Sequence, residues 1–503
     1  MELKPELSGS IDYAKRHGIR HFIAGEFRES AGGGWFENLN PSTNEVLCRV
    51  AGGDAADIDA AVKSAARAFE TWGRTPGEER AAILHLIAKN IRDEKEVLAY
   101  AESLDTGIPI TQTMTQVERA AENFDFFADM IRHVNGEVFK APSGFTNYTE
   151  KKPIGVAGLI TPWNTPLMLE TWKLAPCLAA GDTCVLKPAE WSPMTAWMLA
   201  HLLLKSNLPK GAVNIVQGFG ETAGASLVAH PSVRLISFTG ETETGKLIIK
   251  NGADTLKRFS MELGGKSPLI IFEDADLRRA LDAAVFGVFS LNGERCTANS
   301  RVLVHDSIYD EVADGFREAA ETMKVGDPLE KATELGPLIH PSHLERVLSY
   351  LSIGREEGAK ITAGGGRPRL LDRGNFLLPT VFEGVDNRMH IAQEEIFGPV
   401  VCLMRFESEE EAIRIANDVQ YGLASYVWTE NLEKAHRVAS ELDAGLCWIN
   451  SQNVRDLRTP FGGAKNSGIG REGGKYSFDF YMEDKTIHVA TGKHRIPVFG
   501  RRG

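Results

Sequence analysis

Cysteine is scarce in this chain, with six residues in 503 and no CxxC pair among them. Secreted disulfide frameworks are dense in cysteine, so the sparse pattern indicates reduced thiols inside a cell. The thirteen histidines show no HExxH or similar spacing, and we therefore expect no metal site. The opening residues MELKPELSGS are polar with no apolar stretch behind them, unlike a signal peptide. A cytoplasmic protein is the resulting prediction.

Long apolar runs and an excess of positive charge are missing as well. No run approaches the roughly 18 apolar residues that a membrane helix needs, so no membrane association is expected. Lys and Arg number 56 against 68 Asp and Glu, a formal net charge of −12. A chain this acidic has no general attraction for phosphate backbones, and we expect no nucleic-acid partner.

The composition that remains is that of a soluble globular protein. Hydrophobic residues make up 43% of the chain and charged residues 25%. At roughly 150 residues per domain, the length of 503 predicts about three domains. The 49 glycines and 22 prolines indicate many tight turns between short elements.

Helical patterns mark the first third of the chain. Asp54 is placed to cap a helix, Asp57 lies in its first turn, and apolar residues then recur at helical spacing. Thr75 begins a capping box with Pro76 at the first helical position. This box predicts a long amphipathic stretch that continues toward Gly107.

From about residue 152 short apolar runs alternate with helical patterns. This alternation describes an α/β fold with a parallel sheet covered on both faces, and it resumes after about Ser267 as a second domain. Parallel sheets bind ligands at the carboxyl ends of their strands. Val138 to Lys152 is a candidate edge hairpin, which the tail after Tyr476 could pair with. The predicted strands are Val156 to Ile160, Cys184 to Leu186, Val213 to Val216, Leu235 to Phe238 and Leu269 to Phe272.

Chemically useful side chains follow these strands. Asn164 stands in an irregular turn between two prolines, where it presents an amide or simply holds the turn. Glu262 stands in an apolar run, where an unpaired carboxylate is costly; the alternative to a catalytic role is a salt bridge to Lys266. Cys296 is flanked by polar and flexible residues, although a single cysteine is commonly a small buried apolar group.

Taken in order, these segments resemble the aldehyde dehydrogenase superfamily, and the resemblance extends over nearly the whole chain. The combination of MELGGKSP with a downstream G-x-R-C is the most specific part of it. The matching segments are TPWN from Thr161, KPAE from Lys187, FTGETETG from Phe238, MELGGKSP from Met261, NGERC from Asn292, QEEIFGPV from Gln393 and PFGGAKNSGIGRE from Pro460.

The resemblance implies a catalytic set of three residues. Cys296 matches the nucleophile, and its thiol, with an ordinary pKa near 8.5, must be partly ionised to attack an aldehyde at neutral pH. Asn164 and the backbone N–H of Cys296 match the donors for the resulting oxyanion. Glu262 matches the general base that activates water to hydrolyse the thioester left after hydride transfer.

The resemblance also implies NAD as the cofactor. Lys187 and Glu190 match positions that hold the adenine ribose, and the Glu190 carboxylate would repel the 2′-phosphate of NADP. Glu395 matches the residue that holds the nicotinamide ribose. Glu241 stands where the family often has Ser, which leaves its side-chain contact with the pyrophosphate open. The other expected cofactor residues are Ile160, Trp163, Gly220, Phe238, Gly240, Leu263 and Phe397.

The segment before PFGG carries the signal for the substrate. It resembles the branch that oxidises semialdehydes from aromatic ring cleavage, where Arg455 suits a carboxylate because its planar fork binds one bidentately. Arg119 matches a second pocket arginine, and Arg458 is a further candidate. The alternative for Arg455 is that it pairs only with Asp456 or another acidic neighbour. Trp172 and Phe461 complete the expected substrate site.

The implied substrate is 5-carboxymethyl-2-hydroxymuconate semialdehyde, a small anionic aldehyde. Alternatives are 2-hydroxymuconate or 2-aminomuconate semialdehyde, betaine aldehyde, a coenzyme-A-acylating reaction, and a non-catalytic binding or structural protein on the same fold. The resemblance implies a homodimer or homotetramer. The expected NAD-binding domain spans 1–135 and 154–265, the catalytic domain 266–475, and the oligomerisation ribbon 136–153 and 476–503.

Overall fold

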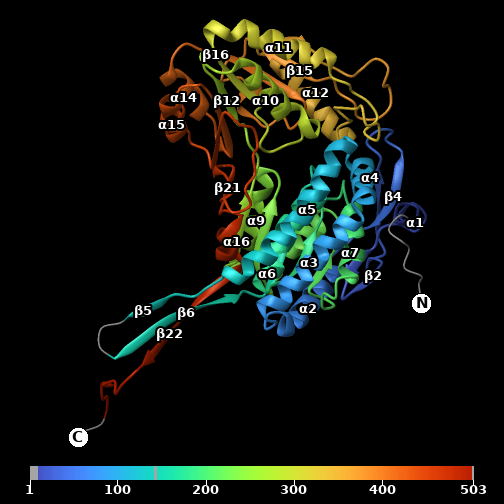
Figure 1. Ribbon diagram of the computed structural model, residues 1–503. Helices are drawn as coiled ribbons and strands as arrows, with labels where there is room; N and C mark the ends of the chain where they lie inside the picture. The colour runs from blue at the N-terminus through green and yellow to red at the C-terminus, as the bar shows by residue number, and fades with distance from the viewer. Residues whose placement is uncertain (1–8, 141–143, 501–503) are drawn as a thin grey trace.

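The computed structural model describes residues 9–140 and 144–500. Two lobes and a projecting ribbon make up the molecule (Figure 1). The lower lobe is drawn from blue to green and the upper lobe mainly in yellow and orange, while three strands extend away from the lower lobe. The predicted α/β class is confirmed, with one large sheet in each lobe.

The sheet of the lower lobe has a parallel centre and antiparallel edges. Its strands lie in the order β2-β1-β9-β8-β7-β10-β11-β21, and the five from β9 to β11 run parallel. The antiparallel edge strands were not predicted, because strands of two or three residues carry too few side chains for a pattern. The bounds are β1 (His21–Ile23), β2 (Glu26–Arg28), β7 (Val156–Ile160), β8 (Thr183–Lys187), β9 (Val213–Ile215), β10 (Val233–Thr239), β11 (Arg258–Glu262) and β21 (Gly468–Ile469).

Helices cover both faces of this sheet, as predicted. On one face, α3, α5, α6 and α7 pack on apolar side chains such as Leu159 and Leu186. On the other, α2, α8 and α9 pack on Val185 and Ile236. The helices of this lobe are α1 (Ser10–His17), α2 (Ala55–Trp72), α3 (Gly77–Asp93), α4 (Lys95–Thr106), α5 (Ile110–Met130), α6 (Pro166–Ala180), α7 (Met194–Leu204), α8 (Ala225–Ala229), α9 (Thr242–Gly252) and the short η2 (Ile131–His133), η3 (Gly220–Gly224) and η4 (Ala253–Thr255).

The two predicted helix starts have different outcomes. Asp54 caps α2, and Asp57 returns a bond to the Asp54 backbone, so the predicted cap is confirmed as a full capping box. The Thr75 capping box is wrong. Pro76 itself is the residue before α3, and the Thr75 hydroxyl donates backwards to the carbonyl of Thr71 at 3.2 Å. The amphipathic stretch is also split, because the helix is interrupted at Glu94.

The upper lobe contains the second predicted sheet. Its strands lie in the order β14-β15-β16-β13-β12-β18-β19, with α10 and α11 on one face and α12 to α15 on the other. The strands are β12 (Pro268–Ile271), β13 (Arg301–His305), β14 (Lys360–Ala363), β15 (Thr380–Glu383), β16 (Val400–Phe406), β18 (Ala424–Trp428) and β19 (Leu446–Ile449). The helices are α10 (Leu277–Phe289), η5 (Ser290–Gly293), η6 (Asp306–Ile308), α11 (Tyr309–Thr322), α12 (Pro341–Glu356), α13 (His390–Gln393), α14 (Glu409–Asn417) and α15 (Leu432–Glu441).

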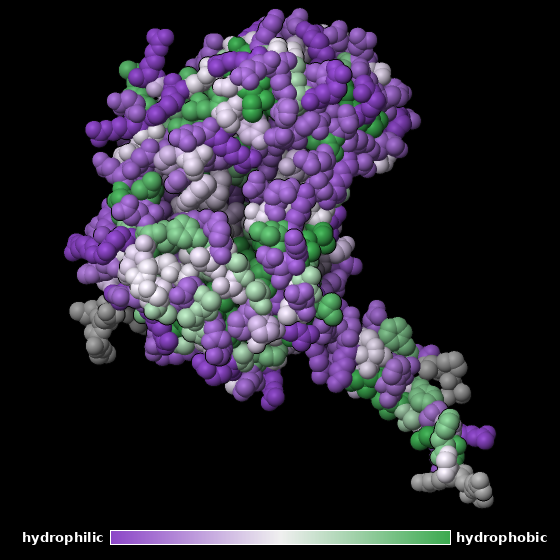
Figure 2. Space-filling view, turned by 180° about the vertical axis from the view of Figure 1, so that it is seen from behind, coloured by the Kyte–Doolittle hydropathy of each residue, from purple (hydrophilic) through white to green (hydrophobic). Residues whose placement is uncertain are grey.

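The candidate hairpin forms the projecting ribbon. β5 (Val138–Lys140) pairs with β6 (Phe145–Pro153), and β22 (Met482–Ala490) pairs with the full length of β6. The tail reaches this position after α16 (Gly474–Tyr481). Two further strand pairs are β3 (Trp35–Leu39) with β4 (Val46–Ala51) and β17 (Tyr421–Gly422) with β20 (Ala464–Lys465). Figure 2 shows hydrophobic residues along the ribbon, and Val138 is 72% exposed there.

A search of the described helices found none that combines the length and apolar character needed to cross a membrane.

Candidate active site

Two cavities meet at Cys296, one on each side of the thiol. Both are lined by Asn164, Glu262 and Cys296, together with Thr239 and Leu263. The first has a volume of about 960 Å³ and the second about 1050 Å³, each counted to its open mouth. The structure therefore brings together the three predicted catalytic residues, although they are more than 30 residues apart in the chain.

Cys296 stands just after a sharply turned segment. The backbone takes left-handed φ values of 54° at Leu291, 59° at Asn292 and 72° at Gly293, which turn the chain after α10. The Asn292 amide fixes this turn by donating to the carbonyls of Gly107 and Pro337, both at 3.0 Å. The thiol is thereby presented in a partly exposed position between the lobes.

The Cys296 thiol is protonated at neutral pH in this structure. Burial first, and then the Glu395 carboxylate nearby, raise its pKa to about 12, although the Arg295 guanidinium opposes both. The sequence argument required a partly ionised thiol. The difference arises because burial penalises the charged thiolate, so a further positive charge or a base is needed for ionisation.

Glu262 ends β11 with its side chain in the shared floor of both cavities. Neither carboxylate oxygen has a hydrogen-bond partner among the described residues. Burial first, and then the neighbouring Glu472, raise its pKa well above the ordinary value. The alternative of a salt bridge to Lys266 is wrong, because the Lys266 ammonium is itself buried without a hydrogen-bond partner among those residues.

Asn164 is held beside the thiol by one of its two amide protons. Its Nδ2 donates to the backbone carbonyl of Glu294 at 2.9 Å, two residues before Cys296. A side-chain amide carries two N–H groups, so one remains for a ligand. This hydrogen bond to the backbone fixes the orientation of the Asn164 amide, and an oxyanion donor must be held in place in this way.

A buried polar network behind Glu262 was not identified from the sequence. The Lys173 ammonium pairs with Glu472 at 3.0 Å and donates to the Ser237 hydroxyl at 2.8 Å. Ser260 donates to the same Glu472 oxygen at 3.2 Å. Lys173 and Ser260 carry no sequence signal for this arrangement, because they come from α6 and β11 and meet only in the folded chain.

The second cavity holds most of the predicted cofactor residues. Trp163, Gly240, Glu241, Leu263, Glu395 and Phe397 line it. Ile160, Lys187 and Phe238 stand in the last two positions of β7, β8 and β10, and Gly220 opens η3. These placements follow the carboxyl edge of the sheet, where such folds bind nucleotides.

The polar groups of this edge fit a nucleotide. Lys187 Nζ lies 3.0 Å from Glu190 Oε2, which offers a donor and an acceptor side by side for ribose hydroxyls. Glu395 accepts the Gly265 N–H at 2.9 Å, and burial raises its pKa to about 7. Glu241 precedes α9, with Arg346 at 4.0 Å from its carboxylate.

The first cavity contains all four predicted substrate residues, Arg119, Trp172, Arg455 and Phe461. The Arg455 guanidinium lies over the Trp172 ring at 4.1 Å, with Nη1 at 3.3 Å from the Met168 sulfur. Among the described residues, neither Arg119 nor Arg455 has a carboxylate within 4.0 Å. Burial, and then the proximity of Arg119, lower the pKa of Arg455 to about 9.

Arg458 is placed differently from Arg455. It is exposed and makes a bidentate ion pair with Asp456, with the closest atoms 2.6 Å apart. The alternative that Arg455 pairs only with Asp456 is therefore wrong, since Arg458 occupies that carboxylate. Arg458 is not among the residues that line the cavity.

The charge balance of the first cavity favours an anion. Three acids line it, but Glu472 is paired with Lys173, Asp456 is paired with Arg458, and the raised pKa of Glu262 favours its neutral form. Arg295 is a further lining cation, which donates to the hydroxyls of Ser290 and Thr297. The position of Arg295 immediately before Cys296 could have predicted from the sequence that it lines the cavity, but it was not used for that.

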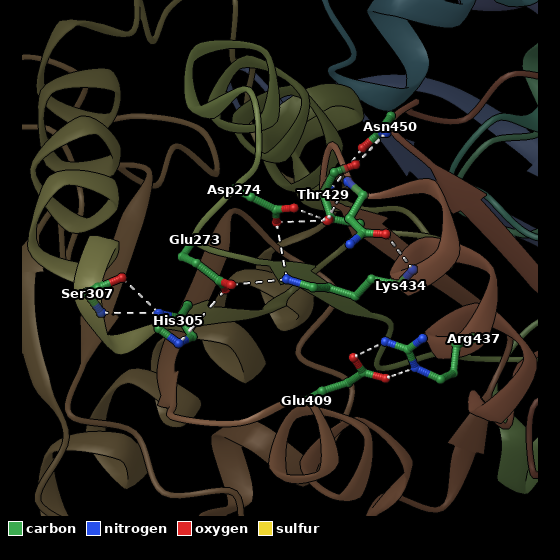
Figure 3. A network of polar contacts seen from close by, with 10 residues as sticks. Glu273, Asp274, His305, Ser307, Glu409, Thr429, Lys434, Arg437 and Asn450 are labelled. Atoms are coloured by element: carbon green, nitrogen blue, oxygen red, sulfur yellow. Dashed lines mark hydrogen bonds and ion pairs between the residues drawn. The ribbon is translucent and has the colours of Figure 1, made fainter.

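A polar network anchors the start of the segment that carries Arg455. Asn450 and Thr429 exchange two hydrogen bonds at 2.8 and 3.1 Å, and the Thr429 hydroxyl donates to Asp274 at 2.7 Å (Figure 3). Lys434 joins Asp274 to Glu273 in the same network. Residues 450–458 thus leave β19 from a point tied to the neighbouring strand β18.

Comparisons with known proteins agree with this geometry. The model of the aldehyde dehydrogenase family matches residues 27–487. The chain is 50% identical over 465 residues to the 5-carboxymethyl-2-hydroxymuconate semialdehyde dehydrogenase of Escherichia coli, covering 91% of this chain and 98% of that one. The chain belongs to the aldehyde dehydrogenase family.

Solved structures support the same assignment. HpcC from Thermus thermophilus superposes with a TM-score of 0.96 at 52% identity, over 98% of this chain and 97% of that chain. An aldehyde dehydrogenase from Bacillus cereus, solved as its NAD⁺ complex, superposes with a TM-score of 0.94 at 43% identity, over 98% and 100%.

Proposed function

We propose that this aldehyde dehydrogenase uses NAD to oxidise a small anionic semialdehyde to the carboxylate. The observation that carries the substrate class is the pair Arg119 and Arg455, two cations without a carboxylate partner in the cavity beside Cys296. An isolated buried charge is costly, so a carboxylated ligand is the natural partner for these arginines. The substrate we propose is 5-carboxymethyl-2-hydroxymuconate semialdehyde, and the cytoplasmic location stays a prediction.

The two cavities divide the reaction between a cofactor side and an aldehyde side. Lys187 and Glu190 would hold the adenine ribose and Glu395 the nicotinamide ribose, and NAD supplies hydride acceptance when bound. Cys296 Sγ gives up its proton to water and forms a bond to the aldehyde carbon, whose C=O π electrons move to the oxygen. The free N–H of Asn164 and the backbone N–H of Cys296 stabilise the resulting oxyanion. Loss of hydride leaves a thioester on Cys296.

Glu262 completes the cycle as the base. It removes a proton from water, the resulting hydroxide attacks the thioester carbon, and the C–S bond breaks to release the carboxylate and the thiol. Its place in the lining of both cavities, beside Cys296, supports this role. The balance is one aldehyde, one water and one NAD⁺ to one carboxylate, one NADH and two protons.

A substrate panel tests the proposed aldehyde. The panel contains 5-carboxymethyl-2-hydroxymuconate, 2-hydroxymuconate and 2-aminomuconate semialdehydes, betaine aldehyde and a neutral aliphatic aldehyde, followed by NADH absorbance. We expect Arg455→Ala to lower kcat/KM for the carboxylated semialdehydes about tenfold to a hundredfold, the range for losing a charged hydrogen bond, and to leave the neutral aldehyde unaffected.

Arg388→Ala is the matched control, because Arg388 is exposed, already paired with Asp386, and absent from the residues that line the cavity. It should leave the whole panel unchanged. An equal loss with charged and neutral aldehydes in Arg455→Ala would contradict the carboxylate role. Higher kcat/KM for betaine aldehyde, a cation, would overturn the anionic substrate class.

The remaining alternatives need one assay each. In the coenzyme-A-acylating reaction the thiol of coenzyme A attacks the thioester, so product forms only when it is present; the placement of Glu262 favours water instead. Formation of carboxylate without coenzyme A would exclude that reaction. Any sustained turnover excludes a purely structural or binding role.

A further inference from the structure

His343 joins three chain segments at the border of the two cavities. It stands in the first turn of α12, 4% exposed, and lines the cofactor-side cavity. Its Nε2 donates to the backbone carbonyl of Phe397 at 2.7 Å. A carboxylate oxygen of Glu294 lies 3.7 Å from the same nitrogen. The imidazole therefore touches the segment of Phe397 and the segment that leads to Cys296.

Phe397 needs such a support. Its φ is +60°, in the left-handed region that a residue with a Cβ rarely adopts outside special turns. Strained backbone persists only where surrounding contacts hold it. The hydrogen bond from His343 ends on the carbonyl of this same residue, and burial lowers the pKa of His343 to about 4, which keeps the ring neutral with its proton on Nε2.

The third segment is the turn that carries Asn164. The Trp163 ring lies 5.0 Å from His343 and 5.2 Å from Phe397, both edge to face. On the other side, Glu294 accepts the Ile339 N–H through its carboxylate and the Asn164 amide through its carbonyl. A shift of His343 would therefore displace the Trp163 ring, which lines the cofactor-side cavity. It would also displace Glu294, whose carbonyl orients the Asn164 amide.

We propose that His343 is a positioning residue, which holds the Phe397 turn and the Glu294–Cys296 segment in register across the two cavities. It touches none of the reacting atoms and acts through its neighbours. The proposal concerns the reaction of the family and is independent of which aldehyde is the substrate.

The test uses His343→Leu, which keeps the bulk and removes the donor, and His343→Gln, whose amide nitrogen reaches the same carbonyl. NAD affinity is measured by quenching of intrinsic fluorescence, and accessibility of Cys296 by its rate of alkylation with iodoacetamide in the absence of nucleotide. Neither readout needs an aldehyde, so failure here is distinct from failure of the substrate proposal. His436→Leu, at an exposed position of α15, is the control.

We expect His343→Leu to weaken NAD binding about tenfold, the effect of one lost buried hydrogen bond, and to speed alkylation of Cys296 as its segment loosens. His343→Gln should restore both to within about threefold. Wild-type values in His343→Leu would overturn the proposal, as would His343→Gln behaving like His343→Leu with an unchanged circular dichroism spectrum. Should the leucine variant fail to fold, His343→Asn, whose amide is too short to reach Phe397, takes its place with the same expectation.

Discussion

The protonation states of Cys296 and Glu262 are set by burial at one point of contact between two cavities. Burial raises the pKa of both groups, which favours the uncharged form of each. Neither the nucleophile nor the base is therefore ionised in advance. A catalytic group that is stored neutral must be converted to its reactive form during the cycle, which ties activity to pH and to what occupies the cofactor side.

Replacing the thiol separates binding from chemistry. Cys296→Ala should lower aldehyde oxidation by a factor of about 10⁴ or more, because no other group at the junction forms the covalent intermediate. NAD affinity, measured by fluorescence quenching, should stay within about twofold, since the ribose-holding residues are untouched. Cys447→Ala, at an exposed position of β19, is a suitable control. Substantial NAD reduction by the alanine variant would remove Cys296 from its assigned role.

The proposed role of Glu262 as the base can be tested by the time course of NADH formation and by the pH dependence of deacylation. Glu262→Gln should still give a first burst of NADH but slow the steady state about 10²- to 10⁴-fold, because water is no longer deprotonated. In the wild type, the raised pKa means that the reactive carboxylate is scarce at low pH and grows as pH rises. Deacylation should accelerate with rising pH in the wild type and lose that dependence in the variant. A normal steady state in Glu262→Gln would contradict the assignment.

At the scale of elements, the segment after β19 depends on its anchor for accuracy. The Thr429 hydroxyl donates to both oxygens of Asp274 at 2.7 and 2.8 Å. The Thr429 backbone exchanges two hydrogen bonds with the side-chain amide of Asn450, whose own φ is +48°. Substrate-lining residues on a loop are only as well placed as the points that hold the loop. The network in Figure 3 lies away from the thiol and yet holds the chain that carries Arg455.

Removing one hydroxyl tests this anchor. Thr429→Val keeps the shape and leaves Asp274 short of a donor, so we expect the thermal midpoint to fall by about 1–3 °C. kcat/KM for a carboxylated semialdehyde should fall about threefold, and NAD affinity should stay unchanged. Thr322→Val, whose hydroxyl only donates back to its own helix, is the matched control. A fall of the same size with neutral aldehydes would show that the anchor serves general stability instead.

The success of sequence prediction also varied by element. Val156 to Ile160 was predicted with its observed bounds, because a short continuous apolar run bounded by turn residues is typical of a fully buried strand. The Thr75 box was wrong, since the capping pattern is local and the extended backbone of Pro76 already ends the preceding turn. The strands β1 to β4 were missed. β1 and β2 have only three residues each, and β3 and β4 form a local hairpin whose burial does not alternate regularly.

At the scale of the whole molecule, the ribbon exposes apolar side chains that no other part of the described chain covers. Three strands project from the lobes and carry exposed apolar residues, including Phe139 at 49% and Val489 at 41% exposure (Figures 1 and 2). Exposed apolar patches and free strand edges favour association. The predicted homodimer or homotetramer would cover this surface, with the ribbon as the contact.

Charge on the ribbon should therefore disrupt assembly. We expect Phe139→Lys with Val489→Lys to lower the molar mass measured by light scattering after size-exclusion chromatography. Lys485→Glu, a charge change on the same strand at a position that is already polar and exposed, is the control. A chain that is monomeric in the wild type, or whose assembly survives both lysines, would contradict the ribbon as the interface.

The stability of the whole chain should depend on two buried acids beneath the Asn164 turn. Burial raises the pKa of Glu102 to about 8 and that of Asp105 to about 7. A carboxyl whose pKa is higher in the folded state stabilises the fold fully below its unfolded pKa, near 4.5 for Glu, and loses that contribution as pH rises through the folded value. We expect the thermal midpoint to fall by several degrees between pH 5 and 8. Glu102→Gln should flatten that fall, and an identical pH profile in the variant would contradict the shift.

The sequence by itself determined the family, the alternation of elements and the identity of the reactive groups. These properties can be predicted from short segments of the sequence. The segments are motifs such as MELGGKSP, the runs of apolar residues, and a cysteine among polar residues. It also supplied Arg119 and Arg455, because residue type and family position together indicate a carboxylate partner.

Only the tertiary structure decided how those groups are charged, paired and connected. It separated Arg455 from Arg458 by giving Asp456 to the latter, and it raised the pKa of Cys296 through burial. It also brought Lys173 to Glu472 and His343 to Phe397 across long stretches of chain. The physical reason is that burial and electrostatic pairing depend on distance in space, and residues far apart in sequence become neighbours only when the sheets and helices pack.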